Sequence, residues 1–209
     1  LFDPAGEEII FAWRPAAQGN PATLTFIADS PAVGYAAYTL ALSDSPPSER
    51  MYVQESTGTG ISNGADTILV EDGELTWRHE HGTIRDLLTF YDGGDAGDAY
   101  NYSPPEPDLI VRADLTDDVR VESSPIYERL ILRHRMRVAV GLRPDRSRSR
   151  GLRLMELVTT VTLYEGLPGV HFRTEFVNTA RDHRLRAHLR TGIKSETVLA
   201  DTPYALVER

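Results

Sequence analysis

One segment of the sequence, D-G-G-D-A-G-D-A-Y-N-Y-S-P-P from Asp92 to Pro105, combines residue types that could do chemistry. Three aspartates recur at every third position with glycine between them, and two tyrosines follow. Glycine allows left-handed backbone turns, so this composition predicts an irregular loop rather than a strand. We expect such a loop to hold its three carboxylates, those of Asp92, Asp95 and Asp98, close together.

Four interpretations of this loop come into question. A calcium loop of the EF-hand type needs acids at alternate positions and a final glutamate, and the spacing here differs. A pair of catalytic carboxylates, as in enzymes that cleave glycosidic bonds, needs a surrounding pocket that a glycine-rich loop does not supply. Two further interpretations are a purely structural acidic turn and a loop that projects into a polar-ligand site. In the last, Tyr100 or Tyr102 would offer a hydroxyl group and a ring.

Two weaker signals involve histidine. His79 and His81 fall on one face of a predicted strand and could bind a metal, but no third ligand is evident, so we interpret them as surface or interstrand histidines. Asp182 and His183 stand between two arginines. They fit either a polar network near a ligand or a turn stabilised by pairing between aspartate and arginine.

Almost every other segment reads as a strand, because apolar and polar residues alternate and β-branched or aromatic residues are common. Asp72-Gly73 is a hairpin turn signal between two of these segments. Convincing helical periodicity is lacking, so the sequence predicts an all-β, antiparallel sandwich. The predicted strands are Glu8–Arg14, Ala22–Ala28, Tyr35–Leu42, Thr67–Glu71, Glu74–His79, Ile126–Val140, Leu154–Tyr164, Val170–Val177, Leu185–Thr191 and Tyr204–Glu208.

The charge is divided unevenly along the chain. The net charge of −9 over 209 residues is the sum of −16 in residues 1–118 and +7 in residues 119–209, where nine arginines lie between Arg129 and Arg153. In the segment 130–140, even positions are mostly apolar and odd positions carry arginine, which places the arginines on one strand face. We expect that face to pair with acidic residues rather than to bind nucleic acid. The loop 143–151 is predicted to be a mobile hairpin connection.

Length and composition exclude several classes of protein. A complete (β/α)₈ barrel takes roughly 250 residues and does not fit. There is no cysteine, so disulfides and thiol chemistry are excluded, and a reducing, cytoplasmic location is favoured. No apolar run of about 18 residues occurs, so we expect no membrane partner. The chain begins with Leu1 rather than Met, which suggests a piece of something longer. The segment Ser43–Ser48 is a candidate domain boundary.

The sequence from Asp92 to Pro105 also resembles the acidic loop of the family 38 glycoside hydrolases, the α-mannosidases and mannosylglycerate hydrolases. Other segments resemble the same family in the same order along the chain, so the resemblance covers nearly all of it. One is similar to the segment that closes the first β-domain of the family, and the others are similar to its C-terminal β-supersandwich. These segments are Ala32–Leu40, and then Arg173–Arg186, Thr191–Ile193 and Ala200–Tyr204.

The resemblance implies a fold and a division of labour. Residues 49–209 would be part of a C-terminal antiparallel β-supersandwich of the galactose mutarotase type, and residues 1–48 the tail strands of a smaller β-sandwich. In the family, zinc and the aspartate nucleophile lie in an N-terminal barrel. This chain would therefore hold no cofactor of its own and would be inactive alone.

The resemblance also implies roles for loop residues. Tyr100 matches the tyrosine that reaches over the barrel's active site and contacts the sugar. Asp92, Asp95 and Asp98 match the loop's acids, which would brace the loop or lie near the sugar, as would Tyr102. The sequence departs from many relatives at Ala99, directly after Asp98, where Glu or Thr is frequent.

Three functional hypotheses follow. The first is a non-catalytic β-region of a zinc-dependent, retaining α-mannosidase-like hydrolase that supports the barrel and lends the loop to a mannoside site. The second is an autonomous carbohydrate-binding β-module. The third, a nucleic-acid binder through Arg129–Arg153, would require salt-sensitive retention on DNA. We expect no nucleic-acid partner, and the sequence leaves the oligomeric state, a homo-oligomer included, open.

Overall fold

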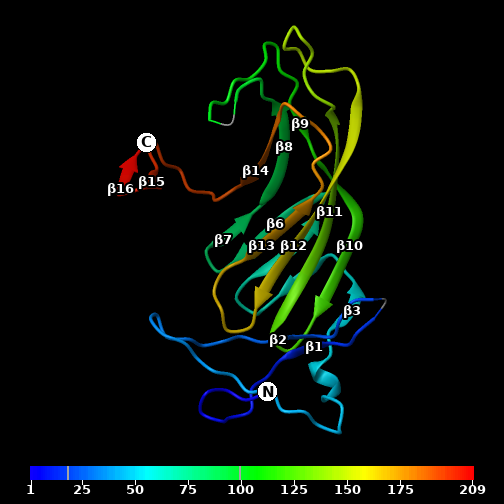
Figure 1. Ribbon diagram of the computed structural model, residues 1–209, viewed down its shortest axis with the longest axis vertical. Coiled ribbons are helices and arrows are strands. Elements are labelled where there is room, and N and C mark those ends of the chain that lie inside the picture. Colours follow the sequence, from blue (N-terminus) through cyan, green and yellow to red (C-terminus); the bar gives the residue numbers. More distant parts are fainter. Residues whose placement is uncertain (18, 99) are drawn as a thin grey trace.

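The computed structural model describes residues 1–17, 19–98 and 100–209 (Figure 1). Within these ranges the chain is all-β, as predicted, with antiparallel sheets and one short 3₁₀ turn, η1 (Glu49–Met51). Among the described residues, no helix has the length and the apolar character that crossing a membrane requires. Ala99 lies outside the described residues.

Three sheets build the main body. The largest sheet has the order β13-β12-β11-β10-β3, a second has the order β4-β5-β6-β7, and a third has the order β14-β8-β9. The strands of the first sheet are β3 (Gln54–Thr57), β10 (Asp114–Ser123), β11 (Tyr127–Ala139), β12 (Leu152–Tyr164) and β13 (His171–Phe176). Those of the second are β4 (Gly60–Ser62), β5 (Thr67–Glu71), β6 (Glu74–His79) and β7 (Gly82–Ile84). Those of the third are β8 (Leu88–Gly94), β9 (Val111–Arg112) and β14 (His183–Leu189).

The three sheets share one apolar core, which makes the body a β-sandwich. Buried side chains from all three sheets form a single cluster, including Ile68 of β5, Phe90 of β8 and Leu130 of β11. The alternation predicted for the two long strands is confirmed, because the even positions of β11 and the odd positions of β12 face this core. The buried residues on them are Leu130, Leu132, His134, Met136 and Val138, and Met155, Leu157, Thr159, Val161 and Leu163.

The arginines of β11 lie on its outer face, as the alternation predicts, and two of them form close pairs with acids. Arg133 Nε lies 3.0 Å from Asp118 Oδ2, and Arg135 Nε lies 2.7 Å from Glu156 Oε1. Glu156 comes from the neighbouring strand β12, so the acidic partners are not confined to the first half of the chain. The positive stretch is therefore partly neutralised within the sheet.

Residues 1–48 form a thin layer at one end of the sandwich (Figure 1). In the described part of this layer two short strands form, β1 (Ala12–Arg14) and β2 (Thr23–Thr25). The third predicted strand, Tyr35–Leu42, is wrong: apart from one bridge between Thr39 and Phe2, this segment has no strand neighbour within the described chain. Alternation alone does not form a strand, because strand hydrogen bonds require a partner. A domain boundary at Ser43–Ser48 stays a prediction.

A final hairpin of β15 (Leu199–Thr202) and β16 (Ala205–Glu208) stands apart from the sandwich in Figure 1. The sequence predicts only the second of its strands.

Candidate functional site

Asp92 does not lie in a loop, and the prediction that the irregular segment begins there is wrong. It belongs to β8, which continues through Gly94 because that stretch pairs with β14, Leu185 lying opposite Asp92 and His183 opposite Gly94. Pairing with a neighbouring strand outweighs the weak strand propensity of glycine. The side chain of Asp92 is fully buried, with 0% of its surface exposed.

Two basic side chains meet the buried carboxylate of Asp92. Arg148, from the loop between β11 and β12, donates from a terminal guanidinium nitrogen to Oδ2. His183, at the start of β14, has its Nδ1 at 2.5 Å from Oδ1. All three side chains are almost inaccessible to solvent. Removing a charge from water is costly, so a carboxylate is buried in this way only where donors surround it.

The other two aspartates of the motif face the backbone of their own loop, which we call the acidic loop (residues 95–105, with residue 99 outside the described part). Oδ1 of Asp95 accepts hydrogen bonds from the N–H groups of Gly97 at 2.9 Å and Ser103 at 3.0 Å. Oδ1 of Asp98 accepts from the N–H groups of Tyr100 and Asn101, both at 2.8 Å.

These backbone hydrogen bonds have an electrostatic consequence. They stabilise the ionised carboxylates and lower the pKa of Asp95 and of Asp98 below their ordinary value. Asp95 and Asp98 therefore act as turn-forming residues that shape the acidic loop, and Asp92 lies apart from them.

Both stems of the acidic loop are tied to neighbouring segments. The N–H of Ala96 donates to the carbonyl of Ser103 at 2.8 Å, and the N–H of Asp95 donates to the carbonyl of Asp182 at 3.0 Å. Arg146 donates to the hydroxyl oxygen of Ser103 at 2.6 Å. The loop between β11 and β12, predicted to be mobile, thus binds the acidic loop through Arg146 and β8 through Arg148.

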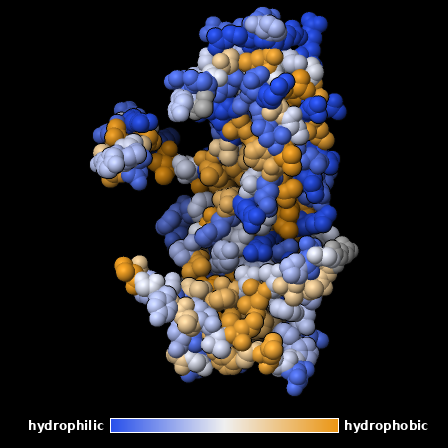
Figure 2. Space-filling view, viewed as in Figure 1, coloured by the Kyte–Doolittle hydropathy of each residue, from blue (hydrophilic) through white to orange (hydrophobic). Residues whose placement is uncertain are grey.

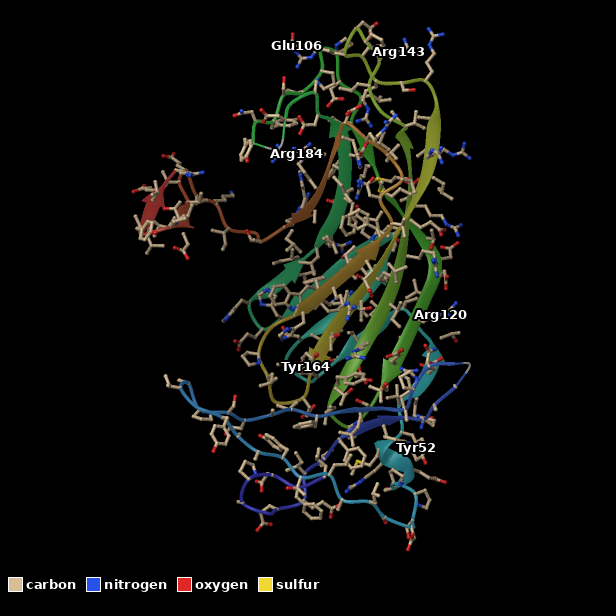
Figure 3. All side chains as sticks on the ribbon, viewed as in Figure 1. Tyr52, Glu106, Arg120, Arg143, Tyr164 and Arg184 are labelled. Atoms are coloured by element: carbon tan, nitrogen blue, oxygen red, sulfur yellow. The ribbon has the colours of Figure 1, made fainter. Side chains whose placement is uncertain are left out.

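The tyrosines of the acidic loop differ in their surroundings. Tyr100 is 93% exposed, whereas Tyr102 is 44% exposed and lies beneath the guanidinium group of Arg184, 4.4 Å from its ring centroid. Figure 3 places Arg184 beside this loop, at the same end of the molecule as Glu106 and Arg143. In the space-filling view this end is largely hydrophilic (Figure 2). It offers hydroxyl, guanidinium and aromatic groups, the side chains that bind polar ligands.

The histidine pair lies elsewhere, at the end of β6. The rings of His79 and His81 meet edge to face with centroids 5.8 Å apart. Across the residues that the structure describes, no group of three or more His, Cys, Asp or Glu side chains is placed to hold a metal ion.

Two solved structures resemble this chain over its whole length. An α-mannosidase from Enterococcus faecalis V583 superposes with a TM-score of 0.68 at 22% sequence identity, covering 100% of this chain and 28% of that one. A protein in glycosyl hydrolase family 38 from Enterococcus faecalis superposes with a TM-score of 0.69 at 22% identity, covering 100% of this chain and 29% of that one. No family model and no curated protein sequence matches the chain.

The chain has the fold of part of a family 38 α-mannosidase. The expected resemblance is thus confirmed at the level of fold, and the family 38 fold accounts for the whole chain. The chain spans less than a third of the length of those two structures. The position of the acidic loop at one end of this fold makes it the candidate site.

Sequence reasoning missed Arg148 and Asn178 as parts of this candidate site. Arg148 was one of several arginines in a polar loop, and Asn178, whose Oδ1 lies 3.0 Å from His183 Nε2, gave no signal. A useful signal lay in the run of residues 87–91, which is apolar or strand-forming and leads directly into Asp92. If the strand continues through Asp92, the carboxylate lies within a sheet rather than in a loop, and a buried carboxylate needs hydrogen-bond donors.

Proposed function

We propose that this chain is the non-catalytic β-region of a longer, zinc-dependent retaining α-mannosidase-like hydrolase, and that its acidic loop forms part of the mannoside site. The observation that carries the proposal is the match of the entire chain to 28% of an α-mannosidase structure. The remaining part of such an enzyme would supply the catalytic residues, and this chain would support it.

Tyr100 is the loop residue best suited to contact a sugar. The carboxylates of Asp95 and Asp98 already accept backbone hydrogen bonds within the loop. The side chain of Tyr100 is exposed and can offer both a hydroxyl group and an aromatic face. Sugars present hydroxyl groups and apolar C–H faces, so a tyrosine at the edge of a sugar site can orient the ring.

The described residues of this chain do not fit a zinc site, since no suitable cluster of ligands is present among them. We therefore assign zinc, as well as the nucleophile and the general acid, to the rest of the longer enzyme. Retaining enzymes need two carboxyl groups about 5 Å apart on either side of the scissile bond. The carboxylates of Asp95 and Asp98 already accept hydrogen bonds from the backbone of their own loop, so we assign neither role to them.

The test is Tyr100→Phe in the full-length enzyme, which removes one hydroxyl group and keeps the ring. We expect kcat/KM for an aryl α-mannoside to fall about tenfold, the loss of one well-formed hydrogen bond to the substrate. Tyr204→Phe, which removes the hydroxyl group of another exposed tyrosine in the β15–β16 hairpin, is the matched control and should have no effect. An unchanged kcat/KM in both Tyr100→Phe and Tyr100→Ala would contradict the role of Tyr100.

A second candidate is an autonomous carbohydrate-binding module, which the exposure of the Tyr100 ring also favours. The two functions differ in what this chain does alone. Calorimetric titration of the folded, isolated chain with mannose would show saturable binding that Tyr100→Ala abolishes if the module is autonomous. If the sugar site is shared with the rest of an enzyme, no binding is expected.

A further inference from the structure

The buried carboxylate of Asp92 joins three separate parts of the chain at the base of the acidic loop. Asp92 lies in β8, Arg148 in the loop between β11 and β12, and His183 at the start of β14. The acidic loop begins three residues after Asp92. Its first backbone N–H, that of Asp95, donates to the carbonyl of Asp182, the neighbour of His183.

His183 is held from both sides. Its Nδ1 lies 2.5 Å from Asp92 Oδ1 and its Nε2 lies 3.0 Å from Asn178 Oδ1. The Asn178 atom is an oxygen, because it also accepts the backbone N–H of Ala180 at 3.0 Å. Both ring nitrogens of His183 therefore face acceptors, so the ring is oriented from both sides.

Arg148 also packs close to Gly94, where the two stems of the acidic loop meet. A methyl group added at Gly94 would lie 3.1 Å from Cδ of Arg148 and 2.5 Å from Cγ of Pro105. Gly94 leads into the acidic loop and Pro105 closes it. The aliphatic part of Arg148 therefore packs where the two stems meet, while its guanidinium group holds Asp92.

We propose that Arg148 and His183 are positioning residues, which act through Asp92 to hold the acidic loop and so to set the place of Tyr100. This inference rests on the proposed function, because the ligand that Tyr100 meets is taken to be a mannoside. Neither Arg148 nor His183 needs to touch the sugar. Their two contacts converge on one carboxylate, so the loss of either should loosen the same loop.

The experiment uses Arg148→Lys and His183→Gln in the full-length enzyme, each alone and combined with Tyr100→Phe. Lysine keeps the charge but loses the forked geometry, and glutamine keeps one neutral donor. We expect each single variant to lower kcat/KM for an aryl α-mannoside about tenfold, as a displaced binding group does. In the Tyr100→Phe background the same change should cost less than about twofold, since the hydroxyl it positions is already gone.

A second measurement reports the loop without using activity. Chymotrypsin cleaves after exposed tyrosines in mobile segments, so cleavage at Tyr100 should be faster in both variants than in the native enzyme. Arg135→Lys, which alters an exposed pair with Glu156, is the matched control and should change neither measurement. If Arg148 and His183 only stabilised the fold, their substitution would lower stability, but its effect on kcat/KM would not depend on Tyr100→Phe.

The outcomes separate the two proposals. Effects of Arg148→Lys and His183→Gln that add fully to that of Tyr100→Phe, or no change in cleavage at Tyr100, would overturn the positioning role. If cleavage at Tyr100 accelerates but Tyr100→Phe leaves kcat/KM unchanged, the loop is held as we propose and the sugar-contacting function of Tyr100 is wrong. Should one variant fail to fold, as a thermal melt would show, the other decides.

Discussion

At the scale of single residues, three aspartates at equal spacing occupy two different kinds of environment. Asp92 is fully buried against Arg148 and His183, whereas Asp95 and Asp98 are in the acidic loop and accept backbone N–H groups. The difference arises from the neighbouring strand. β14 pairs with β8 as far as Gly94, and beyond that residue the chain must satisfy its own backbone.

Asp92→Asn should destabilise the protein strongly. It removes the negative charge between Arg148 and His183 and leaves the buried guanidinium group of Arg148 without a counter-charge. Breaking one partner of a buried ion pair costs about 3–5 kcal/mol, and we expect a loss of that size in urea unfolding. The control is Glu156→Gln in an exposed pair, which should change stability by less than about 1 kcal/mol. Equal losses in the two variants would contradict the assignment.

His134 should make stability depend on pH. It lies on the inner face of β11, edge-on to Phe90 at 5.1 Å, and burial lowers its pKa from 6.5 to about 4. Between these values the unfolded chain binds a proton at this site and the folded chain does not. The folded state therefore loses stability as the pH falls from 6.5 towards 4.

We expect this site to contribute a loss of about 2 kcal/mol between pH 7 and pH 5. The measurement is urea unfolding at both pH values for the native protein and for His134→Leu, which keeps the volume and cannot titrate. The pH dependence should be weaker in the variant by that amount. Parallel curves would show that His134 is not the source.

At the scale of elements, the acidic loop is held by close contact at its stems as well as by hydrogen bonds. At the stems, Gly94 lies so close to Pro105 and Arg148 that these two residues occupy the space of a side chain. Gly151, in the loop between β11 and β12, has only ordinary contact, with Val140 Cγ2 at 3.5 Å from an added methyl group. The two glycines therefore form a matched pair.

Gly94→Ala should push the loop stems apart. A methyl group 2.5 Å from the proline ring forces the backbone to move, and overpacking of this kind costs about 1–3 kcal/mol. We expect a lower melting temperature and faster chymotrypsin cleavage at Tyr100, while Gly151→Ala should behave like the native protein. Native cleavage rates in Gly94→Ala would show that the stem contact does not control the loop.

Alternation in the sequence predicts the long strands β11 and β12, which have one face in the core, but it missed β10, whose Val121 also lies in the core. β5 and β6 have the predicted bounds, and the Asp72-Gly73 turn between them has positive φ at both residues. β8 was missed because glycine and aspartate end it, and β14 supplies the pairing that extends it. Tyr35–Leu42 alternates well but forms no strand, since its one strand neighbour within the described chain is the bridge from Thr39 to Phe2.

At the scale of the whole molecule, folding brings the acidic and the basic halves of the chain together. Arg133 of β11 pairs with Asp118 of β10, and Arg14 near the N-terminus lies 2.7 Å from Glu122. These pairs are partly exposed, so each adds little stability, but together they reduce the positive potential along β11.

The full-length protein should therefore pass through a DNA column without retention in about 0.1 M salt, where surface charges are already screened beyond about 10 Å. Glu156→Gln, which releases Arg135 from its partner, should show at most slight retention. Retention of the native protein that rising salt removes would restore nucleic-acid binding as a function of the arginines.

The sequence by itself determined the all-β class, the inward face of β11 and β12, the outward arginines and the segment that contains the candidate site. These features follow from periodicity and from the composition of neighbouring residues, which are local. Only the tertiary structure decided that Asp92 is buried, that Arg148 and His183 hold it, and that Tyr100 remains exposed. Those contacts join residues 56 and 91 positions apart, and such pairing depends on which strands become neighbours.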